Sequence, residues 1–214
     1  MRKPLELLLS VKRDVNSTLT KFIIIFFLGY IAASCRTSIA SENNDFILWN
    51  GSEQLTFKDF KGKFSPKVFT TDLDGRCATQ CRFEHIIDKN TRLPKFTIKC
   101  YFLRKDSFIR YKNDTITLRH EQVHFNIEEL FCRLTRKSWD SLNALKVRTL
   151  SPYNAVKYKH HKLVARYNRN FDENQTTIAL DSIDDKTEQY VRSNLQTWEV
   201  KLREELRALE EYKE

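Results

Sequence analysis

Glycine and proline are scarce in this chain, with four of each among 214 residues. No repeat period and no low-complexity tract is visible, so repeat arrays and Gly- or Pro-rich disordered segments are excluded. The composition, 41% hydrophobic and 30% charged, is typical of a globular protein. A chain of this length can form one domain with a real core, or one domain and a tail.

Motifs that would make a basic chain a nucleic-acid binder are also missing. The formal net charge is +9. Residues 1–41 contain six Lys/Arg and two Asp/Glu, a net charge of +4, which leaves +5 for the rest. These charges are interspersed, and no zinc finger, helix-turn-helix or Arg-rich arm accompanies them. We therefore expect no nucleic-acid partner, and a mildly basic surface that suits an anionic membrane or wall.

The N-terminal segment has the order of an export signal. Residues 1–21 are cationic, residues 22–33 are apolar, and small residues follow. The apolar run is shorter than the ~20 residues of a comfortable membrane span. Met1 is the only methionine, so no internal start offers a shorter leader. We expect export.

Three fates of this leader remain open. Residues 38–40 offer small side chains for ordinary signal cleavage before Ser41. Residues 32–35 form a loose lipobox, in which Cys35 would be acylated and anchor the protein to a membrane. A retained anchor helix is the third alternative. The expected location is therefore periplasmic or secreted, or membrane-anchored as a lipoprotein.

The rest of the chain changes its hydrophobic period part-way. Residues 42–116 are strand-rich, and within them Lys95 to Leu103 alternates between apolar and polar side chains. Residues 117–214 have the three-to-four-residue period of helices. Three helices are expected, at residues 117–145, 153–167 and 184–212, with Pro152 separating the first two. The sequence predicts one α+β domain over residues 42–214: a small antiparallel or mixed sheet, then a zincin-like metal helix and two further helices.

A His-Glu-x-x-His pentad lies at the head of the first of these helices. Positions i and i+4 share one face of a helix, so His120 and His124 can take two corners of a tetrahedral zinc ion. Glu121 lies beside them, able to take a proton from a zinc-bound water. The structural alternative is a helix with two ordinary histidines, one capping and one packed.

The residues around the pentad resemble those of a family of exported bacterial zinc-dependent proteases of unassigned substrate. Residues 118–129 are similar to its His-Glu-Gln-x-His-Phe-Asp-Ile signature. Trp49 and residues 55–60 resemble its opening Trp and Leu-Thr-Trp-x-Asp-Phe. Its closing motif is matched by Asp184, Thr187, Gln196 and Trp198. The resemblance spans roughly residues 46–206 and implies an exported peptidase that uses zinc.

One departure concerns the third zinc ligand. In the family a His-Gly pair follows the closing Thr, but this chain has Gln189 and Tyr190 there. A catalytic zinc needs three protein ligands and a water. We favour Glu188 as the substitute, and the weaker candidates are Asp184, Asp185, Glu128 and His85. Tyr190 could donate a hydrogen bond to the oxyanion, although a packed tyrosine is the simpler interpretation.

The expected function is an exported zinc-dependent metallohydrolase, most simply a peptidase acting on a protein or peptide substrate through Glu121. The alternative is a catalytically silent envelope protein that keeps the fold with an incomplete metal site. Beyond Cys35, the four cysteines are Cys77, Cys81, Cys100 and Cys132. An even number in an exported chain favours disulfides with three alternative pairings, while a metal knuckle at Cys77 and Cys81 is the weaker interpretation.

Overall fold

The computed structural model describes residues 45–51, 54–69, 73–175 and 185–214, with side chains from residue 189 onward in the last range. The chain divides into two compact units, Met1–Ser41 and Glu42–Glu214. The leader, with Cys35 and the cleavage site before Ser41, lies outside the described residues. The described helices and strands all belong to the second unit.

A three-stranded antiparallel sheet forms its β layer. The strands are β1 (Phe46–Leu48), β3 (Thr79–Ile87) and β4 (Pro94–Leu103), in the order β1-β4-β3. The alternating segment of the sequence is the central strand β4, which pairs Cys100 with Cys81 of β3. A two-stranded antiparallel pair, β2 (Gly75–Arg76) with β5 (Phe108–Ile109), lies apart from this sheet. The 3-10 turn η1 (Phe57–Asp59) follows β1 along the chain.

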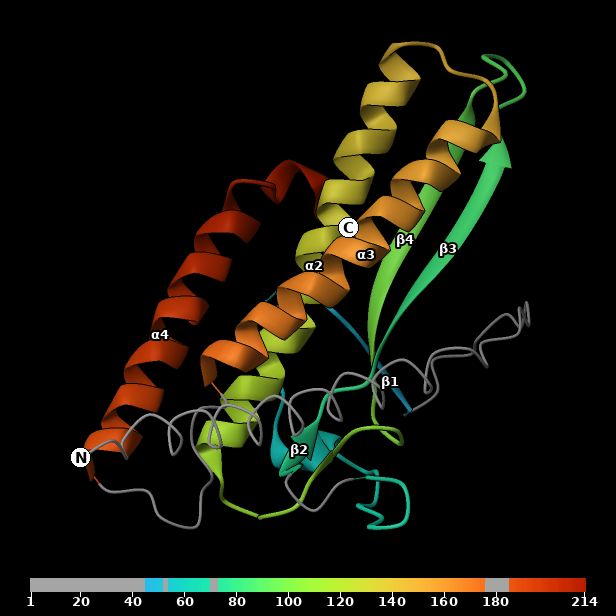
Figure 1. The fold of residues 1–214 in the computed structure, drawn as a ribbon. Coiled ribbons are helices and arrows are strands. Elements are labelled where there is room, and N and C mark those ends of the chain that lie inside the picture. Colours follow the sequence, from blue (N-terminus) through green and yellow to red (C-terminus); the bar gives the residue numbers. More distant parts are fainter. Residues whose placement is uncertain (1–44, 52–53, 70–72, 176–184) are drawn as a thin grey trace, which may run out of the picture. The chain divides into compact units, whose positions relative to one another are not determined.

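Three long helices make up the rest, as the helical period predicted. They are α2 (Thr115–Ala144), α3 (Leu150–Gln175) and α4 (Asp185–Arg207), followed by the 3-10 turn η3 (Glu210–Tyr212). Asp114 caps α2, because its carboxylate accepts hydrogen bonds from the backbone N–H groups of Ile116 and Thr117. The fold is α+β, with the helices running alongside one another (Figure 1).

Three helix boundaries differ from the prediction by more than two residues. Helix α4 ends at Arg207, five residues before the predicted end at residue 212, and the other two boundaries belong to α3. Pro152 does not separate α2 from α3 but lies in the first turn of α3, where its missing N–H costs no hydrogen bond. The chain turns earlier instead, at Lys146, which has a positive φ of 56°. At its other end α3 continues to Gln175, eight residues beyond the predicted end at Tyr167. This extension adds about two turns of mostly polar side chains to the helix.

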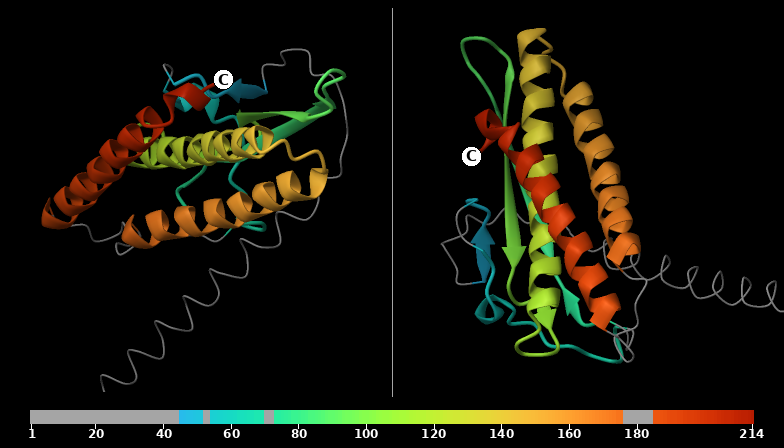
Figure 2. Two further views of the ribbon diagram at one scale, coloured as in Figure 1. Left: turned by 90° about the horizontal axis from the view of Figure 1, so that it is seen from above. Right: turned by 90° about the vertical axis from the view of Figure 1, so that its left-hand side faces the viewer.

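Helix α2 lies at the centre of the domain, between the sheet and the other two helices (Figure 2). Two groups of buried side chains pack against it. The group between α2 and the sheet includes Ile98, Phe102, Phe125 and Trp139. The group between α2, α3 and α4 includes Val123, Ile127, Phe171, Leu195 and Leu202. The helix therefore has a sheet-facing side and a helix-facing side.

Within the described residues, no helix has the length and apolar character needed to span a bilayer.

Candidate metal centre

The two histidines of the pentad converge on the helix-facing side of α2. His120 and His124 lie one turn apart, and their Nε2 atoms are 3.0 Å from each other. The rings meet edge to face, with centroids 4.7 Å apart. Neither side chain is fully covered, since 24% of His120 and 15% of His124 remain exposed. The pair is thus accessible from solvent.

A third donor comes from α3. The Oδ1 atom of Asp172 lies 3.0 Å from Nε2 of His124 and 3.3 Å from Nε2 of His120. Among the described residues, these three side chains form one of the groups whose ligand atoms all lie within 4.8 Å of one another. Around a tetrahedral ion with bonds of about 2.05 Å, donor atoms are about 3.3 Å apart. The triangle fits zinc after shifts of a few tenths of an ångström.

Asn168 fixes the orientation of one imidazole. It lies one turn before Asp172 on α3, and its Oδ1 atom is 2.9 Å from Nδ1 of His124. If Nδ1 donates its hydrogen to this amide oxygen, Nε2 keeps a lone pair that points at the other two donors. Metal-ligating histidines commonly have such a partner on their second nitrogen.

Phe171 forms the apolar floor of the centre. Its ring lies 4.5 Å from the His120 ring and 5.1 Å from the His124 ring, and it is fully buried. On its other side it packs against Trp198 of α4, with centroids 5.2 Å apart. The three donors therefore stand at the edge of the hydrophobic core, where electrostatic interactions are stronger than in water.

The charges of the centre shift the pKa values of His124 and Asp172. Burial lowers the pKa of His124, but the Asp172 carboxylate and its hydrogen bond outweigh this effect and raise it to about 9. Burial raises the pKa of the Asp172 carboxyl, but the two imidazoles outweigh this effect and hold that pKa well below the usual value. Without a metal, the His124 imidazolium and the Asp172 carboxylate therefore form an ion pair at neutral pH.

Glu121 lies beside this pair on the sheet-facing side of α2, and only 4% of it is exposed. Burial raises the pKa of its carboxyl, and the nearby Asp172 adds to the increase, while both histidines and the backbone N–H of Cys77 oppose it. A Cβ atom at Gly75 of β2 would lie 2.6 Å from Oε1 of Glu121. Glycine at this position is what allows β2 to pass so close to the carboxyl.

Residues far away in the sequence brace the head of α2. The indole N–H of Trp49 donates to Oδ1 of Asn126 at 3.0 Å, and the backbone N–H of Leu55 donates to Oε1 of Gln122 at 2.7 Å. On the other side, Arg119 forms two hydrogen bonds of 2.8 and 2.7 Å with the Glu199 carboxylate of α4. These contacts fix the helical turns that carry the two histidines.

No family model matches the chain, and neither a curated protein nor a solved structure is detectably similar to it. The zinc-protease family therefore stays a prediction from the motif residues. Trp49 and Leu55 come from the part of the sequence that resembles the opening motif of that family. Both contact the helix that carries the pentad, so these two parts of the resemblance meet in space.

The ligand candidates at the start of α4 cannot be compared with Asp172. Asp184 lies outside the described residues, and Asp185 and Glu188 lie in the first turn of α4 with side chains outside the described set. Their role as ligands stays a prediction. Tyr190 is 61% exposed, and none of its described contacts reaches either histidine.

The two other candidates lie apart from the histidine pair. Glu128 is buried on the sheet-facing side of α2, where it contacts Cys81 instead of the histidines. His85 stacks on Phe96 within the sheet. The disulfides that an exported chain favours are not formed in this structure, in which all four cysteines of the second unit are free thiols.

Asp172 is the functional residue that the sequence analysis missed. Residues 168–174 were expected to form a polar loop, yet they continue α3. One signal could have revealed this: Val164 and Phe171 are seven residues apart, a spacing that keeps two apolar side chains on one helix face. If residues 168–174 are taken as helical, Asn168 and Asp172 are four residues apart and share one side of the helix, as the two histidines do.

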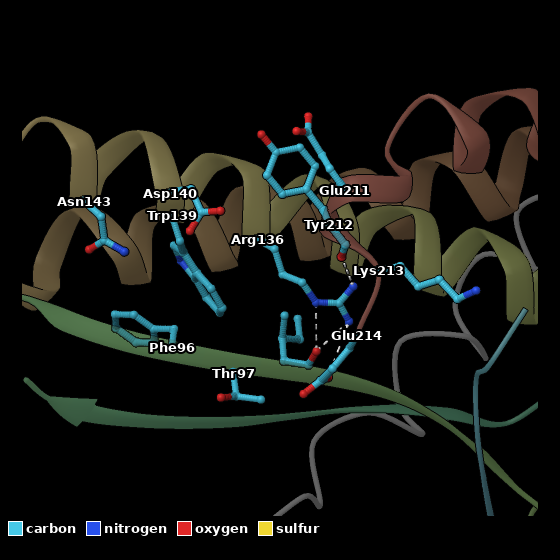
Figure 3. Close-up of a pocket in the computed structure, with 11 residues that line it drawn as sticks. Phe96, Thr97, Arg136, Trp139, Asp140, Asn143, Glu211, Tyr212, Lys213 and Glu214 are labelled. Carbon is cyan, nitrogen blue, oxygen red and sulfur yellow. Dashed lines mark hydrogen bonds and ion pairs between the residues drawn. The ribbon is translucent and has the colours of Figure 1, made fainter.

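A surface pocket lies at the other end of α2 (Figure 3). Arg136 points into it, and its guanidinium donates to the carbonyls of Ile98 at 2.7 Å and Tyr212 at 2.6 Å and to the Glu129 carboxylate at 3.0 Å. Sixteen residues separate Arg136 from His120, about 24 Å along the helix. The pocket therefore belongs to the anchoring of the C-terminal segment and not to the metal centre.

Proposed function

We propose that the protein is an exported zinc-dependent metallohydrolase, most simply a peptidase acting on protein or peptide substrates. The observation that supports this most directly is the convergence of His120, His124 and Asp172, with a buried glutamate beside them. Two nitrogens and one carboxylate oxygen are a donor set that zinc takes in catalytic sites, where a fourth position is left for water or substrate. We therefore propose Asp172 as a third ligand, while the role predicted for Glu188, whose side chain lies outside the described set, stays a prediction.

The chemistry follows from the positions of these groups. When bound, zinc would polarise a scissile carbonyl and acidify a water molecule next to it. Glu121 would be the base for such a water and would return the proton to a leaving amine, since burial raises the pKa of its carboxyl. Asn168 contacts Nδ1 of His124, so that Nε2 of this ring would be the atom that holds the metal.

The test is elemental analysis and peptide hydrolysis measured on the same preparations. The purified protein should contain about one zinc per chain and cleave members of a mixed peptide library. Glu121→Gln should keep the zinc and lose the hydrolysis, whereas His120→Ala should lose both. His85→Ala removes a histidine outside the centre and serves as the matched control, which should change neither property.

Two results would contradict the proposal. If the parent and His120→Ala contain the same trace of metal, the centre does not bind zinc under physiological conditions. If no peptide is cleaved and no stoichiometric zinc is found, the protein is better described as a catalytically silent envelope protein that keeps the fold with an incomplete metal site. The departure from the family pattern at Gln189 favours this second function.

A further inference from the structure

Three thiols and a carboxyl group meet on the sheet-facing side of α2. Cys81 of β3, Cys100 of β4 and Cys132 of α2 supply the sulfur atoms, and Glu128, one turn before Cys132, supplies the carboxyl. The Sγ atoms of Cys81 and Cys132 are 3.1 Å apart, and Cys100 lies within hydrogen-bonding reach of both. Oε1 of Glu128 is 2.9 Å from Sγ of Cys81. We call these four residues the thiol cluster.

Three members of the thiol cluster are removed from solvent, and the fourth, Cys81, is half-buried. Cys100 is fully buried, Cys132 is 1% exposed and Glu128 is 7% exposed. The carboxyl of Glu128 contacts the Cys81 thiol and, at 3.3 Å, the hydroxyl of Thr79. No ion pair joins Glu128 to a lysine, arginine or histidine of the described part of the chain. A carboxyl group this deeply buried is paired with a cation, coordinated to a metal or kept neutral, and in the absence of a metal burial raises the pKa of Glu128.

We propose that the thiol cluster is a second metal site, which binds a thiophilic divalent cation of the Zn²⁺ class through Cys81, Cys100, Cys132 and Glu128. Sulfur donors select such cations over Mg²⁺ or Ca²⁺, which prefer oxygen. Three sulfurs and one carboxylate oxygen complete a tetrahedron, the closed coordination of structural zinc sites. This site has no open position for a substrate.

A disulfide between Cys81 and Cys132 is the competing outcome. It would use two of the three sulfurs and leave Cys100 and the Glu128 carboxyl buried without a partner of opposite charge. A cation engages all four groups at once. With Zn–S bonds of about 2.3 Å, the sulfurs of a tetrahedral site lie about 3.8 Å apart. Side-chain rotation that separates Cys81 from Cys132 by less than 1 Å is enough to admit the ion.

The neighbouring charges help to hold an anionic site of this kind. Glu129 has a ligand atom within 4.8 Å of those of Cys100 and Cys132, and its carboxylate is held by two guanidinium groups. Arg133 lies at 3.1 Å and Arg136 at 3.0 Å from its Oε1 atom. The positive charges of Arg133 and Arg136 partly offset the negative charge that the thiolates would carry in a metal-bound cluster. The metal would join β3 and β4 to α2, the helix that carries the catalytic centre.

The two sites can be distinguished by absorption spectroscopy, because only a metal bound by sulfur gives a thiolate-to-metal charge-transfer band. The full-length protein, reduced and freed of metal, is titrated with Cd²⁺ while the thiolate-to-metal charge-transfer absorption in the ultraviolet is recorded. The absorption should rise and saturate at one equivalent of sulfur-bound metal. Cys81→Ser and Cys132→Ser should abolish it, and Glu128→Gln should weaken the affinity roughly 10- to 100-fold. Cys77→Ser is the matched control and should leave the absorption unchanged.

His120→Ala distinguishes a failure here from a failure of the proposed function, because it removes a donor of the other centre and should not affect this absorption. A second measurement avoids the risk that serine variants misfold: in mild urea, which opens the buried cluster to the reagent, Zn²⁺ should slow the alkylation of three of the thiols of residues 42–214 in the parent protein, while the alkylation of Cys77 keeps the same rate. The proposal is overturned if the folded parent shows no charge-transfer absorption. It is equally overturned if the mass of the native protein is lower than that of the reduced protein by two hydrogens and digestion yields a disulfide-linked Cys81–Cys132 peptide.

Discussion

Replacing Asp172 by asparagine retains the size of the side chain but removes the negative charge beside both imidazoles. Without metal, that charge keeps the pKa of His124 at about 9. An ordinary histidine has a pKa of about 6.5, and one unit corresponds to 1.36 kcal/mol. A shift of about 2.5 units therefore corresponds to about 3 kcal/mol of folding free energy, an order-of-magnitude figure. His124 is 15% exposed, so solvent screening reduces it little.

The sign of the pH dependence follows from the direction of this shift. Because the pKa of His124 is higher in the folded state, the folded protein holds the proton more tightly than the unfolded chain. The stabilisation is complete below pH 6.5 and is lost as the pH rises through about 9. Asp172→Asn should thus lower the stability of the metal-free protein by about 3 kcal/mol near pH 6, and by much less near pH 10.

Urea unfolding of chelator-treated protein at these two pH values measures the difference, and NMR titration of the histidine rings measures the pKa of His124 directly. Glu173→Gln, which neutralises the exposed carboxylate next to Asp172, is the matched control and should change neither. With metal present, Asp172→Asn should also weaken zinc binding by more than the 10- to 100-fold typical of residues that only support a ligand. An equal loss of stability at both pH values, or an unchanged His124 titration, would refute the reasoning.

Three further predictions concern zinc affinity, the packing around Glu121 and the core. Between pH 6.5 and 9 zinc must displace the proton of His124, so the Kd for zinc should fall about tenfold per pH unit. Competition with a chromophoric chelator measures this Kd, and a constant value over that range would contradict the prediction. Gly75→Ala places a Cβ 2.6 Å from the Glu121 carboxyl, so it should lower the free energy of unfolding in urea by about 1–3 kcal/mol. The same variant should keep its zinc and have a lower kcat, and unchanged kinetics would contradict this. Leu202→Ala, at a fully buried position, should cost about 2–5 kcal/mol in the same assay, whereas Val200→Ala, at a 41% exposed position, should cost far less.

Local sequence patterns predicted β4 and α2 because the spacing of apolar side chains in each depends only on residues close together in the sequence. The alternation from Lys95 to Leu103 reflects the pleat of β4, one face of which packs against α2. The three-to-four-residue period of α2 reflects its contacts with the sheet on one side and with α3 and α4 on the other. This helix begins at Thr115, two residues before the predicted start, where the Asp114 carboxylate caps it. The spacing of the two histidines depends only on helix geometry, so it too was accessible from the sequence.

Boundaries set by tertiary contacts were less accessible. Pro152 was expected to end a helix, but proline is equally suited to the first turn, and local sequence does not separate the two positions. The polar residues at the end of α3 have weak helix propensity, and packing overrides it. Phe171 is buried against Trp198 and both histidines, which holds the last turns of α3 in place.

The third donor illustrates why a ligand set is harder to predict than a motif. His120 and His124 share one helical turn, so their relation is fixed before the chain folds. Asp172 comes from another helix, forty-eight residues after His124, and reaches the pair only because α2 and α3 pack in one register. A candidate chosen by counting along the family pattern, such as Glu188, assumes that the ligand comes from the same place in every relative. The geometric requirement is weaker: any carboxylate that packing brings within about 3.3 Å of both imidazoles can serve.

The two sides of α2 carry different chemistry for a physical reason. Its helix-facing side is partly open at the first turns, so His120 and His124 keep access to solvent, as a substrate site requires. Its sheet-facing side is closed, so Glu128 and Cys132 are removed from water and suit a structural ion better than a reacting one. Glu121 lies between these two environments: it is buried enough for its pKa to rise, yet one residue from the open centre. That position, more than the pentad itself, equips it to move a proton.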